Sequence, residues 1–509
     1  MSRDLVIGID SSTSATKAIA WDAEGRAVAE GRVAIAMSNP SPGYFEQDPT
    51  DWWSSTAGAL RQLTAKVDPA RIAGLGISNQ RETFGFFSAD GTALRPGMVW
   101  LDERAKIQLT RFGESFGAER VHAISGKPID LVPAIYRMIW TRDNEPEVFA
   151  RAERIAEVHG YLTFRLTGNW TTSTASADPM GALDMNKHGW SEQILDAIGV
   201  GREKMLDLAT PGTQTGTLGA AASEATGLPR GLPVIAGGGD GQCAGTGAGV
   251  SAHRPRRAYI NLGTALVSGS FGSDYRHDRA FRTEIAIADH GYIFETCLRT
   301  GTFLVDWLTR EVFGVDAMGK RDLLIALEKE AAASPIGARG VVVVPYWQGC
   351  MTPYWDSCAR GIIAGLSGST RRGDVYRAFL EGVALEQAHS SDNVTKATGV
   401  PIDDFVAIGG GAASDLWVQI LADATGRPVQ RSETVEASSL GAAIAAAKGV
   451  GWYPTMSDAT AAMAGKPVRT FEPDPKRAAR YQELRAVHAE LWPQVASWNE
   501  RLSRFVERG

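Results

Sequence analysis

The sequence predicts an α/β protein with two domains, and three observations support this. The chain has 509 residues, which exceeds the roughly 250 to 300 residues at which a single hydrophobic core stops growing. Apolar runs typical of strands alternate with helical patterns, and two of them end in glycines directly before a helix. A strand, a short hydroxyl-bearing turn and a second strand occur near the N-terminus and again near residue 260. Two similar halves would explain both the length and the repetition.

The composition is that of an ordinary globular protein and argues against several classes of partner. Hydrophobic residues make up 44% of the chain and charged residues 22%. The net charge is -6, with acids and bases mixed along the sequence, so neither nucleic acid nor membrane is an expected partner. No signal peptide or membrane-spanning run is recognisable, and four cysteines, far apart except for the last two, suggest no disulfide framework. We therefore expect a cytoplasmic protein.

The first elements are three strands, over residues 5–9, 16–21 and 27–35. The turn between the first two contains Asp10, Thr13 and Ser14 among other hydroxyl-bearing residues, and Lys17 follows it. Such a hairpin offers several hydrogen-bond donors to a phosphate, although no Walker sequence occurs in the chain. The simpler alternative is that serine and threonine are there because they favour turns.

Polar residues follow the next predicted strand, over residues 72–77, which comes after a helix starting near Pro49. Gln80, Arg81 and Glu82 lie directly behind this apolar run, and Trp100 follows a further short segment. Charged groups at the end of a buried strand must be paired or bound to a ligand. Together with an aromatic ring they suit a hydroxylated small molecule, whereas the alternative is a surface ion pair of little energetic value. Beyond them, residues 121–140 are predicted to be helical.

The centre of the chain, VIAGGGDGQCAGTGAGV over residues 234–250, holds the candidate catalytic acid, Asp240. A short strand gives way to glycines, which let the backbone turn and let another molecule approach it. Small residues then predict a tightly packed helix, and ligands gather at such strand-to-helix junctions. Two alternatives are a glycine-rich turn with a solvated aspartate and a dinucleotide fingerprint, although Asp240 interrupts the latter.

The second half begins with a strand over residues 258–262, the turn residues Gly263 and Thr264, and a strand over residues 266–269. This arrangement resembles the opening hairpin and indicates an internal duplication. We therefore predict a domain boundary near Ser251, which gives domains of residues 1–251 and 252–509.

Later elements are mostly helical, with one further strand that ends in glycines. That strand, residues 405–408, leads into Gly410 and Gly411, which would admit a flat nucleobase or ribose, and a helix with Asp415 near its start follows. The remaining helices are predicted over residues 304–312, 321–333, 375–397, 437–448 and 475–506.

These segments, in this order, resemble the FGGY family of carbohydrate kinases, which has the actin-like ATPase fold. Five motifs carry the resemblance, and they span nearly the whole chain. They are GIDSSTSATKAIAWD, GGGDGQCAGTG, NLGTALVSG, GIIAGLSGSTRRGDVYRAFLE and IGGGAASDLWVQILAD. The fourth departs from the family signature at Phe379, where a smaller residue is usual. The resemblance implies two actin-like (ribonuclease H-like) domains, each a mixed sheet flanked by helices, with a cleft between them.

The resemblance also implies roles for the candidate residues. Asp240 would be the general base for the attacking hydroxyl, and Asp10, with Asp240, would hold Mg²⁺, mainly through water. ATP would be bound by hairpin and loop residues: Thr13, Ser14, Lys17, Gly263, Thr264, Gly410, Gly411 and Asp415. The sugar or polyol would be bound by Gln80, Arg81, Glu82, Trp100 and Asp240. This set suits phosphoryl transfer, in which positioning and charge neutralisation supply most of the catalysis.

The identity of the acceptor is open. Arg81 and Glu82 resemble glycerol kinases and differ from the Met-His pair of xylulose kinases. Val132, however, stands near the place of a substrate-contacting Tyr of glycerol kinases, and Gly241 replaces their Gln. These changes should enlarge the pocket, so we expect a sugar alcohol or ketose of four to six carbons. Glycerol kinase or xylulose kinase proper is the alternative.

Two other classes of protein share this fold. One is a chaperone-like ATPase, but no additional substrate-binding domain is recognisable in the sequence. The other is a catalytically silent sugar-binding regulator, but no helix-turn-helix extension is recognisable and Asp240 is intact. The sequence leaves the oligomeric state open, and a homodimer is possible.

Overall fold

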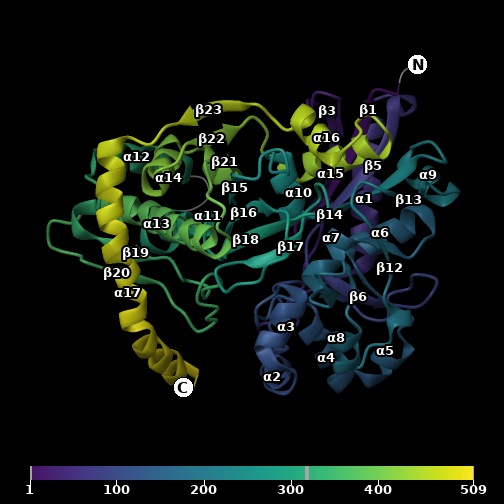
Figure 1. Ribbon diagram of the computed structural model, residues 1–509, viewed down its shortest axis with the longest axis horizontal. Helices are drawn as coiled ribbons and strands as arrows, with labels where there is room; N and C mark the ends of the chain where they lie inside the picture. Colours follow the sequence, from purple (N-terminus) through teal and green to yellow (C-terminus); the bar gives the residue numbers. More distant parts are fainter. Residues whose placement is uncertain (1–2, 316–319, 508–509) are drawn as a thin grey trace.

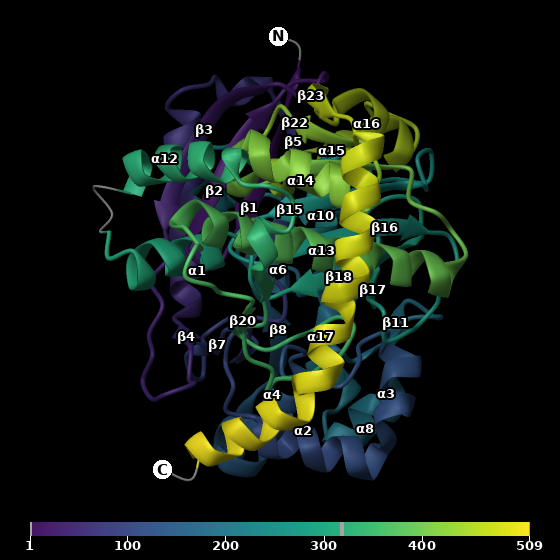
Figure 2. The same cartoon turned by 90° about the vertical axis from the view of Figure 1, so that its left-hand side faces the viewer.

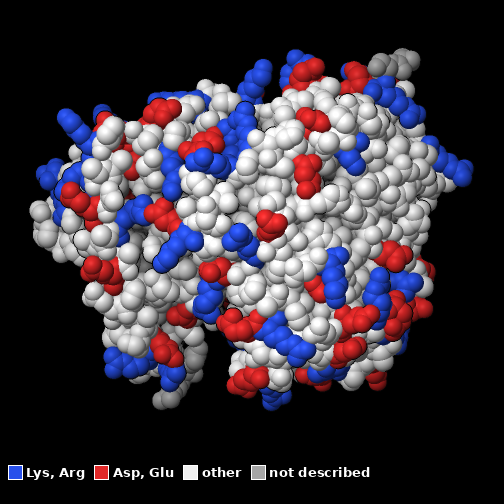
Figure 3. All heavy atoms as spheres, viewed as in Figure 1, with Lys and Arg blue, Asp and Glu red and all other residues white. Residues whose placement is uncertain are grey.

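Two lobes, each built on one large sheet, make up the computed structural model, which describes residues 3–315 and 320–507 (Figure 1). The first lobe lies on the right of Figure 1 and the second, which carries the C-terminus, lies on the left. The predicted architecture of two α/β domains with mixed sheets is therefore confirmed. In Figure 3 the surface is hollowed at its lower edge, between the lobes.

The first sheet has six strands in the order β13-β14-β5-β1-β2-β3. The hairpin of β1 and β2 is antiparallel, whereas β5 runs parallel to β1 and β14 runs parallel to β5. Crossovers of this kind bring the carboxyl ends of β1, β5 and β14 to one edge of the sheet. The bounds are β1 (Leu5–Ser11), β2 (Ala15–Trp21), β3 (Ala27–Ala34), β5 (Ile72–Asn79), β13 (Gln214–Thr217) and β14 (Pro233–Gly239).

The second sheet has seven strands in the order β17-β18-β16-β15-β21-β22-β23. Here too an antiparallel hairpin, β15 with β16, pairs with a parallel strand, β21. The bounds are β15 (Arg257–Leu262), β16 (Leu266–Gly272), β17 (Arg282–Ile285), β18 (Tyr292–Leu298), β21 (Asp404–Ile408), β22 (Val429–Ser432) and β23 (Pro467–Phe471).

Four smaller sheets complete the strands of the described residues. One has four strands in the order β4-β7-β6-β8, and the pairs β9/β12, β10/β11 and β19/β20 form the others. Their bounds are β4 (Glu46–Gln47), β6 (Phe84–Phe87), β7 (Gly97–Met98), β8 (Arg154–Glu157), β9 (Thr171–Ser173), β10 (Leu183–Asp184), β11 (Gly189–Trp190), β12 (Asp207–Ala209), β19 (Val342–Val344) and β20 (Ile362–Ala364).

The helices begin and end where local chemistry favours it. In α1, for example, Asp48 accepts a hydrogen bond from the backbone of Thr50 and Pro49 occupies the first turn. The bounds are α1 (Pro49–Thr64), α2 (Lys106–Phe112), α3 (Ala118–Ser125), α4 (Ile135–Asn144), α5 (Pro146–Arg151), α6 (Val158–Thr167), α7 (Thr174–Ala177), α8 (Glu192–Ile198), α9 (Ala220–Thr226), α10 (Asp240–Gly247), α11 (Thr302–Trp307), α12 (Lys320–Ala333), α13 (Arg372–Thr398), α14 (Asp415–Thr425), α15 (Ala437–Gly449), α16 (Met456–Met463) and α17 (Pro475–Glu507).

The predicted helix over residues 121–140 is wrong, because two helices, α3 and α4, occupy this region. Gly126 ends α3 in the left-handed conformation, with φ 71°. Pro128 and Pro133 lie in the connection, where a proline removes a backbone donor and disfavours a helical residue before it.

Helix α15 comes late in the chain yet packs on the first sheet (Figure 1). Glycines of two strands make this close approach feasible. A Cβ atom at Gly8 would collide with the carbonyl of Ser439, and one at Gly76 would collide with that of Ala442. The alanines of α15 are buried in a cluster with residues of β1 and β2. The predicted boundary near Ser251 falls between α10 and β15. Helix α15 follows this boundary in the sequence but packs on the sheet that precedes it.

The longest helix, α17, runs down the outer side of the second lobe (Figure 2). No helix in the described part of the chain combines the length and the apolar character needed to cross a membrane. On the face shown in Figure 3, acidic and basic side chains are interspersed and no large patch of one charge is visible.

Candidate active site

Asp240 is the first residue of α10 and directly follows β14, as its sequence context predicts. Its Oδ1 accepts a hydrogen bond from the backbone of Gly241 at 2.8 Å and lies 3.0 Å from Nε of Arg81. Its side chain is 40% exposed, and its Oδ2 has no bonded partner among the described residues. One carboxylate oxygen is thus held and the other is free to accept a proton.

The glycines before Asp240 serve packing within the chain. A Cβ atom at Gly237 would collide with the carbonyl of Ile77, and one at Gly238 would collide with the side chain of Ile287. At Gly239 the added atom would lie 2.5 Å from Cγ of Arg81. The expectation that these glycines let another molecule approach is therefore wrong, because other parts of the chain occupy that space.

Asp10 lies at the end of β1, and Ser78 at the end of β5 donates to its Oδ1 at 3.1 Å. Burial, and after it the negative charge of Asp240, raise the pKa of Asp10 to about 7. The structure thus brings Asp10 and Asp240 near one another. Two carboxylates suit Mg²⁺, which usually takes one or two from the protein and completes its shell with phosphates and water. No cluster of three such metal-binding side chains exists in the described parts of the chain.

The turn of the first hairpin contacts Trp100, one of the residues predicted to bind the acceptor. The indole Nε1 of Trp100 donates to Oγ1 of Thr13 at 3.0 Å. Ser14 is exposed. Lys17 bonds both carboxylate oxygens of Glu436, the residue before α15, at 2.6 Å each. The cation predicted to contact phosphate is thus paired with an acid from the late part of the chain.

Gln80 is buried, and its side-chain amide is engaged by the protein. Its Nε2 donates to Gln47 at 2.8 Å, and its Oε1 accepts from Thr83 at 3.0 Å. Gln80 therefore supports the strand end in this structure.

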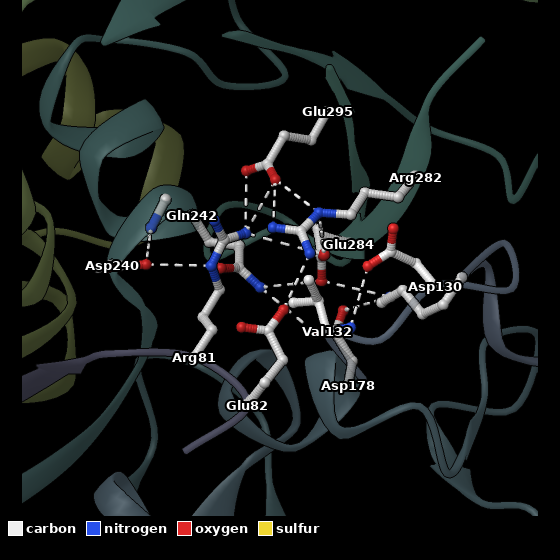
Figure 4. A network of polar contacts seen from close by, with 12 residues as sticks. Arg81, Glu82, Asp130, Val132, Asp178, Asp240, Gln242, Arg282, Glu284 and Glu295 are labelled. Atoms are coloured by element: carbon white, nitrogen blue, oxygen red, sulfur yellow. Dashed lines mark hydrogen bonds and ion pairs between the residues drawn. The ribbon is translucent and has the colours of Figure 1, made fainter. Parts of the chain in front are cut away.

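Arg81 and Glu82 belong to a buried network of charges that joins the two lobes (Figure 4). Nη1 of Arg81 lies 2.9 Å from Glu295 on β18, and Oε1 of Glu82 lies 2.9 Å from Arg282 on β17. Arg282 also contacts Glu295 at 2.7 Å. The alternative of an isolated surface ion pair is therefore wrong, because each of these four side chains is at most 9% exposed.

Gly241 does not leave an empty space. A Cβ atom there would lie 2.8 Å from Oε2 of Glu295 and 2.9 Å from Nη2 of Arg81. The argument that the missing side chain enlarges the pocket is wrong at this position, because Arg81 and Glu295 fill the room.

The second hairpin and the predicted nucleotide loop lie together. The backbone of Gly263 and Thr264 accepts hydrogen bonds from Thr302 and Gly301, at 2.8 and 2.7 Å, and the Thr264 side chain is exposed. A Cβ atom at Gly411 would lie 3.0 Å from that of Leu262, at the end of β15.

Gly410 and Asp415 lie on either side of the start of α14. No atom lies within 4 Å of the position of an added Cβ at Gly410, so this glycine faces open space. The carboxylate of Asp415 contacts Arg431 at 2.6 Å and also Arg469. Of these two residues, Gly410 offers the freer surface to a nucleotide.

Sequence reasoning missed the charged residues contributed by the second half: Arg282, Glu284, Glu295 and Glu436. A signal was present, because Arg282 and Glu284 alternate in the short strand RTEI and Glu295 is the one charged residue of YIFETCL. A charge inside a predicted buried strand requires a partner.

Two hairpin-led α/β lobes, with a carboxylate at a strand-to-helix junction between them, define the class as a two-domain phosphotransferase. The family models agree: residues 5–247 match the N-terminal domain of the FGGY family of carbohydrate kinases, and residues 258–450 match its C-terminal domain. The chain belongs to this family and is an ATP-dependent sugar or polyol kinase.

Similar proteins include kinases for different acceptors. A xylulose kinase of Bacillus subtilis (strain 168) is 28% identical over 98% of this chain and 99% of its own length. A glycerol kinase of Citrifermentans bemidjiense is 30% identical over 94% of this chain and 96% of its own. The crystal structure of ligand-bound xylulose kinase from Lactobacillus acidophilus has a TM-score of 0.91 at 23% identity, covering 98% and 99% of the two chains.

Proposed function

We propose that this kinase transfers the γ-phosphoryl group of ATP to a hydroxyl of an uncharged sugar alcohol or ketose of four to six carbons, with Asp240 as general base. The observation that carries the proposal is the free Oδ2 of Asp240 beside a side chain fixed through Oδ1. A fixed carboxylate orients an attacking hydroxyl and accepts its proton as the bond to phosphorus forms.

Magnesium fits the donor set of Asp10 and Asp240, which would hold it mainly through water. When bound, it would neutralise charge on the phosphates. Lys17, the backbone at Gly263, the hydroxyl of Thr13 and the exposed hydroxyls of Ser14 and Thr264 are the proposed phosphate contacts. Gly410, Gly411 and Asp415 are the proposed contacts to adenosine. Closure of the lobes would exclude water, which otherwise competes with the acceptor.

The balance of charges supports a neutral acceptor. Arg81 and Arg282 are each matched by buried carboxylates. The free oxygens of the site, Oδ2 of Asp240 and Oε2 of Glu82, accept hydrogen bonds and would repel a sugar acid. Hydroxyl groups, which donate, complement them.

The aliphatic wall beside Glu82 supports an acceptor longer than glycerol. Arg137 donates to the carbonyls of both Glu82 and Val132, at 2.9 and 2.7 Å, so these residues are neighbours. Val132 packs with Cys297 and Met351. An aliphatic side chain at this place is smaller than an aromatic ring and offers no hydroxyl, which leaves more room for carbon atoms of the acceptor.

The test is ADP release from the full-length chain with Mg-ATP, with and without a panel of glycerol, four- to six-carbon polyols, ketoses including xylulose, and gluconate. We expect turnover that depends on a neutral acceptor of four to six carbons. Glycerol or gluconate as the best acceptor by kcat/KM would contradict the proposal. Xylulose as the single good acceptor would favour the narrower function of a xylulose kinase, the activity named for the similar protein of Bacillus subtilis. ATP hydrolysis independent of any acceptor would point to an ATPase, and binding without turnover to a regulator.

A further inference from the structure

Four charged side chains, two from each lobe, form a continuous chain of ion pairs that ends at Asp240 (Figure 4). Arg81 contacts Glu295 at 2.9 Å, Glu295 contacts Arg282 at 2.7 Å, and Arg282 contacts Glu82 at 2.9 Å. Arg81 then reaches Asp240 at 3.0 Å. The acceptor side of the first lobe is thus tied to strands β17 and β18 of the second.

Glu82 is held in an unusual backbone conformation. Its φ is 57°, in the left-handed region that residues other than glycine rarely adopt. The fully buried guanidinium of Arg137 donates to its carbonyl at 2.9 Å. Such conformations persist where the surrounding structure over-determines them, and they cluster at binding and catalytic sites. The backbone of Glu82 is therefore fixed within its own lobe.

The side chain of Glu82 is fixed from the other lobe. Nη1 of Arg282 donates to its Oε1 at 2.9 Å, and its Oε2 has no bonded partner among the described residues. Burial raises the pKa of Glu82 to about 7, while the guanidinium groups of Arg282 and then Arg81 oppose the rise. A buried carboxylate deprived of its cation takes up a proton or turns away.

We propose that Arg282, a residue of the second lobe, is a positioning residue of the acceptor site: it holds Glu82 charged and aimed so that Oε2 accepts a hydroxyl of the neutral acceptor. This inference rests on the proposed function, since it assigns Glu82 to acceptor binding. It adds that recognition of the acceptor depends on a residue outside the first lobe.

Glu284 and Glu295 give Arg282 its own orientation. Nε of Arg282 lies 3.2 Å from Glu284, and Glu295 accepts from it at 2.7 Å. Tyr259 donates to the other oxygen of Glu295 at 3.1 Å. The guanidinium therefore has three carboxylate neighbours, and it reaches Glu82 from a fixed position.

The experiment compares Arg282→Met and Arg282→Lys with the parent enzyme and with Arg276→Met, an exposed arginine in the loop before β17. Acceptor KM, ATP KM and kcat are measured with the best acceptor of the panel, and acceptor binding is measured by calorimetry. For Arg282→Met we expect acceptor KM to rise about 30-fold or more, with ATP KM within about threefold of the parent value. Arg282→Lys, which keeps the charge, should recover most of the loss, and Arg276→Met should behave as the parent.

A second measurement addresses variants that lose stability. In the double variant Glu82→Gln with Arg282→Met, the buried cation and the buried anion are removed together, so the melting temperature should exceed that of Arg282→Met alone. If Arg282 acts through Glu82, the losses in kcat/KM for the acceptor will be far from additive.

Additive losses, or equal rises of acceptor KM and ATP KM, would overturn the inference and leave Arg282 a purely structural residue. An unchanged acceptor KM in Arg282→Met would overturn it as well. If the parent enzyme phosphorylates a neutral acceptor and the Arg282 variants give any of these results, the inference about Arg282 fails and the proposed function stands. If the parent enzyme binds no acceptor of the panel, the inference and the proposed function fail together.

Discussion

Arg81 places its Nε 3.0 Å from Oδ1 of Asp240, across the ends of two neighbouring parallel strands. The contact selects one oxygen of the carboxylate and leaves the other unpaired. The proposed base is thus oriented before any acceptor arrives.

Asp240→Asn removes the proton acceptor while it keeps the shape and the contact with the backbone of Gly241. We expect kcat to fall about 10³-fold, within the range for loss of a general base, with ATP affinity nearly unchanged. Steady-state kinetics and ATP calorimetry check this. Asp207→Asn, at a side chain that is 86% exposed, is the matched control. A variant that keeps more than a small fraction of kcat would show that the base lies elsewhere.

Arg81→Ala is expected to raise acceptor KM far more than ATP KM. The guanidinium contacts Asp240 and Glu295, and none of its bonded partners lies in the predicted ATP loops. A rise of about 10- to 100-fold corresponds to a lost charge-assisted contact of ~1.4 to 3 kcal/mol. Arg81→Lys should show a smaller rise, and its melting temperature separates loss of binding from loss of folding. Equal effects on both KM values would remove Arg81 from the acceptor site.

Acidification is expected to weaken acceptor binding. The pKa of Glu82 is raised to about 7 by burial, so a fall in pH from 8 to 6 protonates the carboxyl that pairs with Arg282. Acceptor KM should rise about tenfold for each pH unit below the pKa, because only the ionised form binds well. The measurement uses saturating Mg-ATP at every pH, which separates this titration from that of Asp10. Glu82→Gln should give a high acceptor KM without this pH dependence. If acceptor KM in that variant rises with falling pH as steeply as in the parent enzyme, another group is responsible for the titration.

Glu436→Gln and Lys17→Met are expected to act in opposite directions on ATP. Glu436 bonds Lys17 through both oxygens, so the neutral amide would free the ammonium group for phosphate. ATP KM should fall about threefold in Glu436→Gln and rise about tenfold or more in Lys17→Met, since a phosphate contact is charge-assisted. Isothermal titration with a non-hydrolysable ATP analogue checks both. If both variants weaken ATP binding, the pair is a structural link between the hairpin and α15.

Gly241→Ala is expected to disturb the acceptor site although it adds a single methyl group. The new Cβ would meet Glu295 at 2.8 Å and Arg81 at 2.9 Å, closer than carbon normally approaches these atoms. Displacement of Arg81 should lower kcat/KM for the acceptor about tenfold or more. Gly368→Ala, where no atom lies within 4 Å of the added Cβ, is the control. Unchanged kinetics in Gly241→Ala would show that Arg81 can shift without loss.

Local sequence patterns predicted most of the elements of the fold. The apolar runs at β1, β5, β14 and β21 and the glycines behind two of them predict strand-to-helix junctions, and the structure has these elements with ends shifted by a few residues. The error at α3 and α4 arose because an apolar helical period continued across Gly126, Pro128 and Pro133. The left-handed glycine ends the first helix, and the prolines prevent the helix from continuing despite the apolar period.

Only the part of the candidate site that the first lobe contributes was predictable from the sequence. Asp10, Arg81 and Asp240 lie at or just beyond the carboxyl ends of strands of one sheet, so their meeting follows from the order of the elements. The partners Glu295 and Glu436 come from segments more than 190 residues away from the residues they bind. Pairing at that separation depends on how two lobes dock, which no local pattern in the sequence specifies.

Helix α15 has a consequence for synthesis of the protein on the ribosome. Residues 5–247 emerge long before α15, which covers Val6, Ile19 and Trp21 in the native core. At ~5–20 residues per second, translation of the intervening segment takes roughly 10 to 40 s. Throughout that interval the nascent first lobe bears an uncovered apolar face, so a message truncated after the first lobe would yield an aggregating product. The first lobe therefore completes its core only when the second half of the chain has been made.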